Sequence, residues 1–354
     1  MLTTRTLFID HAIAGHPRTA EIERGISYQK RELTSGERHP GGGILLTRNR
    51  GGFVKPCPGM KGAVCCGLWV VEWGMGCPFQ CEYCVLQVYQ TSGDLTLYVN
   101  WEDCLEEVSR LRQQVRGPIR LCTGEFGDSL ALEPDFPLNT LLARHTAGFA
   151  EFTLELKSKS VCIESLLTLP ETRHLIVSFS LNAPRIMTHL EHGTASLEQR
   201  LTAARALAER GIRLAFHFDP IVALPGWETE YQETVAAMHR TLPAQADIAW
   251  ISLGTFRFPR FFPDRALETF PGSILFQEEF HPSFDGKLRY FRPLREQLYR
   301  HLSRLLNDAF PGVRTYLCME SEDVWERVTG KRRHSGDLRC LLDQAVPCGQ
   351  VTSA

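Results

Sequence analysis

Three cysteines with short, unequal spacing are the residues of this chain that point most directly to a chemistry. Cys77, Cys81 and Cys84 lie in the run GCPFQCEYC, with three residues between the first two and two residues between the last two. Three thiolates at this spacing fit three corners of a cubane [4Fe–4S] cluster and leave its fourth iron without a protein ligand. An open iron can bind a small molecule, as the open position of a catalytic zinc does. The alternative is a zinc site that another Cys or His completes.

The composition of the chain fits an enzyme of this kind. Its 354 residues are 43% hydrophobic, enough for one large α/β domain or two ordinary ones. The formal net charge of −2 gives no global positive field, so a nucleic-acid site would have to be a local groove. No apolar run is long enough for a membrane span, and the N-terminus has no signal-peptide pattern. Twelve cysteines in such a chain indicate metal ligands or redox groups in a cytoplasmic protein rather than a disulfide scaffold.

The elements that must position the cysteines follow an alternating β–α pattern. Short apolar runs, typical of strands that are covered on both faces, occupy residues 68–73, 119–123, 152–156, 175–181, 212–218 and 248–256. Helical patterns lie between them at 102–115, 197–210 and 228–242. This alternation predicts an α/β fold, a partial (β/α)6 barrel with N- and C-terminal extensions. A flat, doubly wound sheet is the alternative, and in both folds ligands bind at the carboxyl ends of the strands.

The chain divides into four segments. Residues 1–66 are predicted to form an N-terminal extension that is partly irregular, and residues 67–256 form the barrel. Residues 257–330 are a C-terminal region with a possible role in binding substrate or DNA. Residues 331–354 are basic, then small and polar, and are expected to be a flexible tail.

Several motifs follow the cysteines in order, and together they carry a family resemblance. They are CTGEFGDS at 122–129, ELKSKS at 155–160, SFSLN at 178–182, GTASLEQR at 193–200, and DPI followed by GW and Tyr231. The cysteine spacing, with Tyr83 before the third cysteine, resembles the signature of radical S-adenosylmethionine (SAM) enzymes. The ordered set, over about residues 67–242, resembles the spore photoproduct lyase family of these enzymes. The later stretches DGKLRYFRPLR and YLCMESEDVW look like a lyase-like branch of that family.

The resemblance implies two cofactors, a [4Fe–4S] cluster and SAM. The reduced cluster would cleave SAM to a 5′-deoxyadenosyl radical, and the protein would position both groups. The residues that match the SAM-binding positions of the family are Thr123, Gly124, Glu125, Lys157, Ser180 and Asn182. Glu125 would accept from the SAM ammonium and Lys157 would donate to its carboxylate. The alternatives are that Lys157 is a strand-end lysine that reaches solvent, that Gly124 is only a turn glycine, and that Ser180 and Asn182 have local turn or ladder roles.

The resemblance also implies catalytic roles for Cys122 and Tyr83. In the lyases, a thiol at the position of Cys122 gives a hydrogen atom to the repaired thymine radical. The alternative for Cys122 is a small, buried hydrophobic residue. The lyases carry a second tyrosine directly after the third cysteine, where this chain has Val85. The route by which the radical returns is therefore in question.

Other cysteines and histidines have no evident ligand spacing. Cys57, Cys65, Cys66 and Cys318 could bind a second cluster or a zinc ion, or could be ordinary buried thiols. Cys104 and Cys162 lie in helical patterns and are interpreted as packing residues. His217 lies within a strand pattern and is interpreted as a core residue with a hydrogen-bond partner.

Basic and aromatic residues in the C-terminal region could form a wall against DNA. The first group is Arg257, Arg260 and Arg265 among Phe256, Phe258, Phe261 and Phe262, and the second is Lys287, Arg289, Tyr290 and Arg292. The alternative is a solvated face whose aromatics pack in the core. The expected function is a spore-photoproduct-lyase-like repair of a thymine photoproduct in DNA, with an electron donor such as a flavodoxin or ferredoxin. A radical SAM enzyme that acts on a small molecule or protein, and a zinc-binding structural protein, are the other classes.

Overall fold

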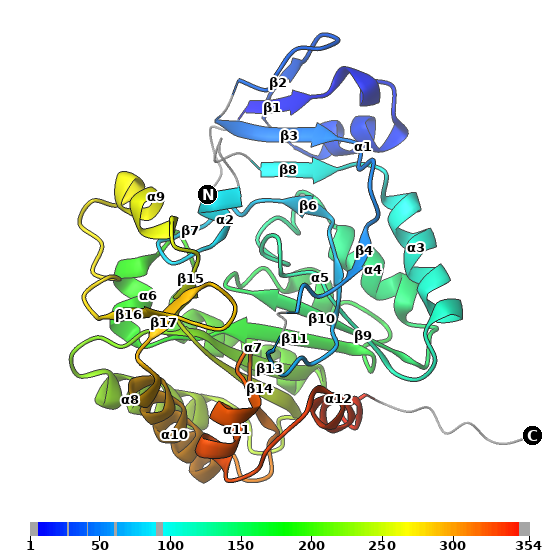
Figure 1. The fold of residues 1–354 in the computed structure, drawn as a ribbon. Helices are drawn as coiled ribbons and strands as arrows, with labels where there is room; N and C mark the ends of the chain where they lie inside the picture. Colours follow the sequence, from blue (N-terminus) through cyan, green and yellow to red (C-terminus); the bar gives the residue numbers. More distant parts are fainter. Residues whose placement is uncertain (1–5, 27, 41, 60–61, 90–94, 347–354) are drawn as a thin grey trace, which may run out of the picture.

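The computed structural model describes residues 6–26, 28–40, 42–59, 62–89 and 95–346. Its main element is an eight-stranded sheet in the order β18-β14-β13-β11-β10-β9-β5-β4 (Figure 1). The bounds of the strands are β4 (Val54–Pro56), β5 (Trp69–Val71), β9 (Ile119–Cys122), β10 (Phe152–Ser158), β11 (Leu175–Ser180), β13 (Arg213–Ile221), β14 (Ile248–Thr255) and β18 (Thr315–Leu317). Every neighbouring pair is parallel except β4 with β5.

This sheet confirms the predicted partial barrel. Each of the six predicted strands forms, and they stand side by side in chain order from β5 to β14. The crossovers include the predicted helices as α3 (Trp101–Gln114), α7 (Leu197–Glu209) and α8 (Trp227–Thr241). Helix α7 begins with the capping box that the sequence indicates, because the Ser196 hydroxyl and the Gln199 side chain each satisfy the other's backbone N–H.

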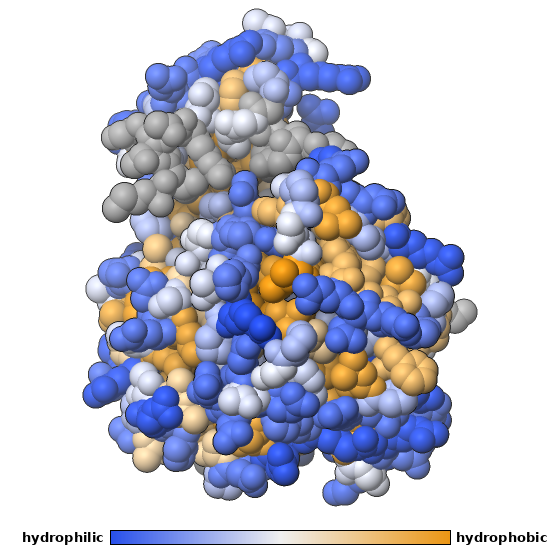
Figure 2. Space-filling model, turned by 90° about the vertical axis from the view of Figure 1, so that its left-hand side faces the viewer, coloured by the Kyte–Doolittle hydropathy of each residue, from blue (hydrophilic) through white to orange (hydrophobic). Residues whose placement is uncertain are grey.

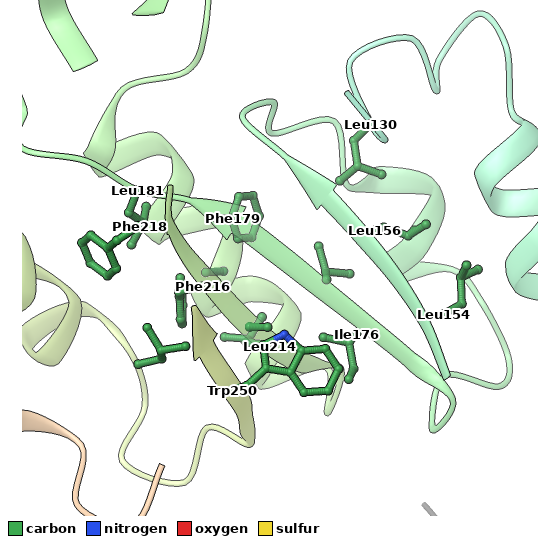
Figure 3. Packing of buried hydrophobic residues seen from close by; sticks show 14 of the residues in the cluster. Leu130, Leu154, Leu156, Ile176, Phe179, Leu181, Leu214, Phe216, Phe218 and Trp250 are labelled. Carbon is green, nitrogen blue, oxygen red and sulfur yellow. The ribbon is translucent and has the colours of Figure 1, made fainter. Parts of the chain in front are cut away.

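The strands separate an apolar face from a polar one, as the alternation of side chains along a strand requires. On β10, Leu154 and Leu156 are fully buried in the hydrophobic core. Figure 3 shows these side chains together with core residues of the next strands, among them Phe179 and Phe216. Glu155 and Lys157 alternate with the leucines and lie on the opposite face. The ligand-binding face of the sheet is therefore polar at the carboxyl ends of the strands.

The N-terminal extension folds into a second sheet, in the order β2-β1-β3-β8-β6. Strands β1 (Thr6–Ile9), β2 (Gln29–Glu32) and β3 (Gly43–Thr47) come from residues 1–66, and helix α1 (Pro17–Gly25) lies between the first two. Strands β6 (Gly74–Met75) and β8 (Leu95–Tyr98) come from the segment that also carries the three cysteines. The extension is therefore joined to the segment around the cysteines by strand pairing.

The C-terminal region packs around the end of the barrel sheet. It contains β15 (Arg257–Phe258), α9 (Phe262–Thr269), the hairpin of β16 (Phe280–Pro282) and β17 (Leu288–Tyr290), α10 (Arg292–Ala309) and α11 (Glu322–Thr329). Helix α12 (Ser335–Asp343) forms within the segment expected to be a flexible tail. Its Leu338 and Leu342 are buried against the core, which is the physical reason for the difference from that expectation. Residues 347–354 lie outside the described residues.

Candidate active site

The loop that carries the three cysteines is held at its start and at its middle. Strand β7 (Gln80–Cys81) pairs with β12 (Glu191–His192), and the Cys84 N–H donates to the Cys81 carbonyl at 3.0 Å. At the start of the loop, the Gly76 N–H donates to the carbonyl of Phe126 at 2.8 Å. A Cβ on Gly127 would lie 2.6 Å from the Gly76 carbonyl, so this approach requires glycine. The loop is thus fixed against the turn that follows β9.

The three thiols are a donor set of the kind that holds iron–sulfur clusters. Burial raises the pKa of Cys77, and the charges of Asp128, Cys81 and Cys84 raise it further, so the sulfurs lie close to one another. Even so, no three His, Cys, Asp or Glu side chains converge on one metal ion within the described ranges. The irons of a cubane occupy separate corners, so its thiolates stand farther apart than the ligands of one ion. Lys159 lies beside the thiols, and its ammonium interacts favourably with Cys81.

The turn predicted to bind SAM lies against the end of β10. The Lys157 ammonium forms an ion pair with the Glu125 carboxylate, and both side chains are partly exposed. A Cβ on Gly124 would lie 2.7 Å from the Lys157 Cβ and 2.8 Å from its carbonyl oxygen. Glycine is therefore needed for this close approach. The alternative in which Lys157 simply reaches solvent does not agree with this pairing.

The other residues expected at the SAM site divide into two groups. Asn182 is engaged by the protein: its amide nitrogen donates to the Pro220 carbonyl at 2.8 Å and its amide oxygen accepts from the Tyr231 hydroxyl at 2.6 Å. The Thr123 hydroxyl is 2.8 Å from that of Ser129 and is fully buried. These two side chains position the turn and strand end from within. Ser180 is at the carboxyl end of β11, and its backbone carbonyl accepts from Arg200 at 2.7 Å.

Cys122 is the last residue of β9 and is fully buried. It is in register with Glu155 of β10 and with Val70 of β5. Burial raises the pKa of its thiol well above the ordinary value, while the Lys157 ammonium opposes that rise. The thiol therefore keeps its hydrogen at neutral pH and lies near the Glu125–Lys157 pair.

Tyr83 belongs to a buried hydrogen-bond network that its sequence position does not indicate. Its hydroxyl donates to Glu191, and the Arg200 guanidinium donates to the same carboxylate at 2.6 Å. Arg200 and Glu191 are both buried. The Lys159 ammonium lies 5.6 Å from the centroid of the Tyr83 ring. This geometry favours a role for Tyr83 in positioning the cysteine loop. Val85, in place of the family's tyrosine, is 38% exposed.

Two further polar pairs, a hydrogen-bonded His–Glu pair and an Arg–Asp ion pair, lie on the polar face and were missed by the sequence analysis. His217 Nε2 is 2.6 Å from Glu155 Oε1, which confirms His217 as a core residue with a partner. Although burial opposes it, the His217 interaction lowers the pKa of Glu155 to about 2. Arg257 binds Asp219 through both Nη atoms, at 2.9 and 3.0 Å. The signal for both pairs is a charged residue inside an apolar strand pattern, but sequence alone does not identify the partner.

Most aromatic residues of the predicted wall against DNA are buried, although Phe261 is 60% exposed. Phe256, Phe258 and Phe262 are buried and pack on one another, with ring centroids 4.8 to 6.2 Å apart. Arg289 and Tyr290 are likewise buried, and Arg289 pairs with Asp285. The physical reason is that these rings form the core beneath the β16–β17 hairpin. Cys162 is also misassigned, because it precedes helix α5 (Glu164–Leu167) rather than lying in it.

A second surface, which shares Arg292 with the second predicted group, presents aromatic and basic groups to solvent. A groove of about 930 Å³ is lined by His281, Phe284, Phe291, Arg292, Arg295 and Asp323, among others. Phe284 and Phe291 are 48% and 56% exposed. Figure 2 shows one face of the molecule, on which hydrophobic residues lie among hydrophilic ones. None of the helices within the described ranges has the length and hydropathy that a membrane crossing needs.

Comparisons with known proteins agree with this geometry. The family described as spore photoproduct lyase matches residues 67–311. The spore photoproduct lyase of Clostridium acetobutylicum is 26% identical over 204 residues, which is 56% of this chain and 60% of that protein. The enzyme of the same name from Bacillus subtilis is 26% identical over 181 residues, 49% of this chain and 52% of that protein. The chain thus matches between half and three fifths of the length of these relatives.

Solved structures of the lyase share the fold. A spore photoproduct lyase complexed with dinucleoside spore photoproduct has a TM-score of 0.78 and 20% identity, and the match covers 90% of this chain and 99% of that one. A variant with bound AdoMet (SAM) and dinucleoside spore photoproduct has a TM-score of 0.76 and 19% identity over the same shares. At these identities the likeness establishes the fold. Because the family match covers most of the chain, the protein belongs to the spore photoproduct lyase family.

Proposed function

We propose that this protein is a radical SAM lyase that reverts a thymine photoproduct in DNA. The observation that carries the proposal is the position of Cys122, a buried, protonated thiol at the end of β9 beside Glu125 and Lys157. When bound, the reduced cluster and SAM supply a 5′-deoxyadenosyl radical. Cys77, Cys81 and Cys84 would hold the cluster, and the rest of the site would orient SAM and substrate.

Each polar group near the turn has a distinct task in this proposal. Glu125 accepts a charge-assisted hydrogen bond from the SAM ammonium, and Lys157 donates to the SAM carboxylate. The Ser180 hydroxyl would form a hydrogen bond with the ribose or the carboxylate of SAM. Thr123 and Asn182 position these groups through their own hydrogen bonds within the protein.

Cys122 would complete the repair. Its S–H bond breaks, a C–H bond forms on the thymine radical, and the unpaired electron stays on sulfur as a thiyl radical. The Tyr83 hydroxyl donates a hydrogen bond to the Glu191 carboxylate and so holds the cysteine loop in place. Val85 stands where the family has a tyrosine, so the hydrogen atom that returns the Cys122 thiyl radical to a thiol would have to come from a different group.

A surface groove supports a nucleic-acid substrate. The groove lined by Phe284, Phe291 and Arg292 offers exposed rings that stack on bases and a cation for phosphate. A base must leave the duplex before a radical can reach it, and exposed aromatic side chains assist that step. A flavodoxin or ferredoxin would supply the electron. Every cysteine that the structure describes is a free thiol, which agrees with a reducing cytoplasm.

The direct test is an anaerobic assay with dinucleoside spore photoproduct, SAM and dithionite. We expect 5′-deoxyadenosine and the repaired dinucleotide from the parent, and neither from the Cys77→Ala, Cys81→Ala or Cys84→Ala variant. Cleavage of SAM without repair would assign the protein to the class that acts on a small molecule or protein. A purified protein that holds zinc and no iron after reconstitution would contradict radical chemistry altogether.

A further inference from the structure

The turn that carries Glu125 is an irregular segment, residues 123–129, between β9 and the loop that follows it. A segment that lacks the regular bonds of a helix or strand must be fixed by other contacts. The Phe126 carbonyl accepts from the Gly76 N–H at 2.8 Å, and the Ser129 N–H donates to the Lys157 carbonyl at 3.1 Å. The side chain with the most hydrogen bonds in this turn is Asp128.

The Asp128 carboxylate bridges the end of the turn and the end of β10. Its Oδ1 accepts from the backbone N–H groups of Leu130 and Ala131, at 3.0 and 2.9 Å. The same oxygen accepts from the Ser158 hydroxyl at 2.7 Å. Its Oδ2 accepts from the backbone N–H of Lys159 at 2.6 Å. One carboxylate therefore joins two segments that are about thirty residues apart in the sequence.

These contacts require a carboxylate rather than an amide. Every partner of the Asp128 oxygens within the described ranges is a hydrogen-bond donor. An ionised carboxylate accepts on both oxygens, whereas an Asn side chain has to turn its NH2 group toward one of these donors. The Ser158 hydroxyl is oriented for its part, because its own oxygen accepts from the Ser160 N–H at 2.8 Å.

Asp128 keeps its charge in a buried place. The residue is 6% exposed, and among the residues that the structure describes no Lys, Arg or His side chain forms an ion pair with it. A buried carboxylate without a cation is costly unless several hydrogen bonds compensate it. A turn that only had to close could use neutral residues here, so the retained charge indicates that this geometry matters.

The bridge fixes the two groups that are expected to hold SAM. Glu125 lies in the turn before Asp128, and Lys157 directly precedes Ser158. The neighbouring Ser129 adds to the same connection, since its hydroxyl accepts from the Lys157 backbone N–H at 3.0 Å. The spacing between the Glu125 carboxylate and the Lys157 ammonium, which form an ion pair, therefore depends on this junction.

We propose that Asp128 is a positioning residue of the SAM site. It holds Glu125 and Lys157 at the spacing that the ammonium and carboxylate of the SAM methionine group require. Asp128 does not touch SAM, because the protein's own donors occupy both of its oxygens. A site that is ordered before binding has less to lose in entropy when the ligand arrives. The inference rests on the proposed function, since it assumes that Glu125 and Lys157 bind SAM.

The test is equilibrium binding of SAM to the full chain after anaerobic reconstitution. Asp128→Asn should raise the dissociation constant about tenfold, which corresponds to about 1.4 kcal/mol, while the iron content stays that of the parent. In the Lys157→Ala background the same substitution should raise it by no more than about threefold, because one of the two positioned groups is already gone. A merely structural role would give equal effects in both backgrounds.

A control and a milder variant complete the test. Asp10→Asn is the matched control, because Asp10 accepts from the Ala12 N–H and the Thr47 hydroxyl in the N-terminal sheet. It should leave SAM binding unchanged even if urea unfolding shows a loss of stability. Ser158→Ala removes a single donor of the bridge and should weaken SAM binding in the same direction as Asp128→Asn, but less. If Asp128→Asn does not fold, as circular dichroism would show, Ser158→Ala decides the question.

The electron paramagnetic resonance signal of the reduced cluster gives a second readout. Added SAM should change this signal in Asp128→Asn to the same final form as in the parent, but at a higher SAM concentration. SAM affinity equal to that of the parent in both Asp128→Asn and Ser158→Ala would overturn the inference, as would equal effects of Asp128→Asn with and without Lys157. A parent that holds iron but binds no SAM would contradict the proposed function, and the inference with it.

Discussion

The Tyr83 hydroxyl donates a hydrogen bond to the buried carboxylate of Glu191. Tyr83 lies between the second and third cysteines of the cluster loop, and Glu191 lies in β12, which pairs with the strand that contains Cys81. The Arg200 guanidinium holds the other oxygen of Glu191 and also binds the Ser180 carbonyl. One network therefore connects the cysteine loop, helix α7 and the end of β11.

Tyr83→Phe should reduce the free energy of unfolding by about 1–3 kcal/mol, because it leaves a buried carboxylate oxygen without its donor. SAM cleavage should continue, since Arg200 still holds Glu191. Urea unfolding and the yield of 5′-deoxyadenosine measure the two effects. Tyr89→Phe is the control, since Tyr89 is 69% exposed. Unchanged stability together with lost repair would instead assign Tyr83 a role in radical transfer.

Arg200→Ala should destabilise the protein by about 3–5 kcal/mol, because it leaves the buried Glu191 charge without its partner. Arg205 is on the same helix but exposed, where it pairs with Glu209. Arg205→Ala should change the free energy of unfolding by no more than about 0.5 kcal/mol. Equal losses in the two variants, measured by urea unfolding, would mean that the buried network does not stabilise the fold.

Lys157→Ala should weaken SAM binding by on the order of 1.5–3 kcal/mol, since it deletes a charged hydrogen-bond donor. Iron content should not change. Equilibrium binding of SAM to the reconstituted protein measures the effect. Lys55→Ala is the matched control, because Lys55 pairs with Glu72 at the surface and is about half exposed. If both variants bind SAM as the parent does, Lys157 is not a SAM ligand.

Glu133 should make stability depend on pH. Burial raises the pKa of its carboxyl to about 8, although the Thr140 N–H donates to it at 3.1 Å. Between its ordinary value of 4.5 and about 8, the folded state holds a proton that the unfolded state has lost. The free energy of unfolding should therefore fall as the pH rises through this window. Glu133→Gln should remove this fall in the free energy of unfolding. The control is Glu164→Gln, at an exposed residue, which should keep the fall. Urea unfolding at about pH 6 and at about pH 9 measures both effects. A parent as stable at the higher pH as at the lower would contradict the assignment.

The sequence predicted the barrel because its signals are local. Strands β9, β10 and β11 are short segments rich in apolar residues, and helix α7 carries its own capping box. The cysteine loop and the Gly124–Glu125 turn are likewise contiguous motifs. Pairs such as Glu155 with His217 and Asp219 with Arg257 join residues far apart in the chain, so only the fold brings them together.

The errors have a similar origin. The aromatic run around Phe256 is compatible with a buried core and with an exposed surface. The packing of the β16–β17 hairpin against these rings places them in the core. The N-terminal sheet was not predicted because β8 and β6, two of its strands, come from the barrel segment. Helix α12 forms because the body of the protein covers Leu338 and Leu342, which local composition does not reveal.

The proposed function depends most on Cys122 as the hydrogen donor. The decisive measurement is the ratio of repaired dinucleotide to 5′-deoxyadenosine in the parent, in Cys122→Ala and in Cys122→Ser. All three should cleave SAM at similar rates, because the thiol acts after the substrate radical has formed. In both variants the ratio should fall sharply and adducts of the trapped substrate radical should accumulate, since an O–H bond is too strong to replace S–H. If Cys122→Ser repairs as cleanly as the parent, the hydrogen comes from elsewhere and Cys122 is a packing residue.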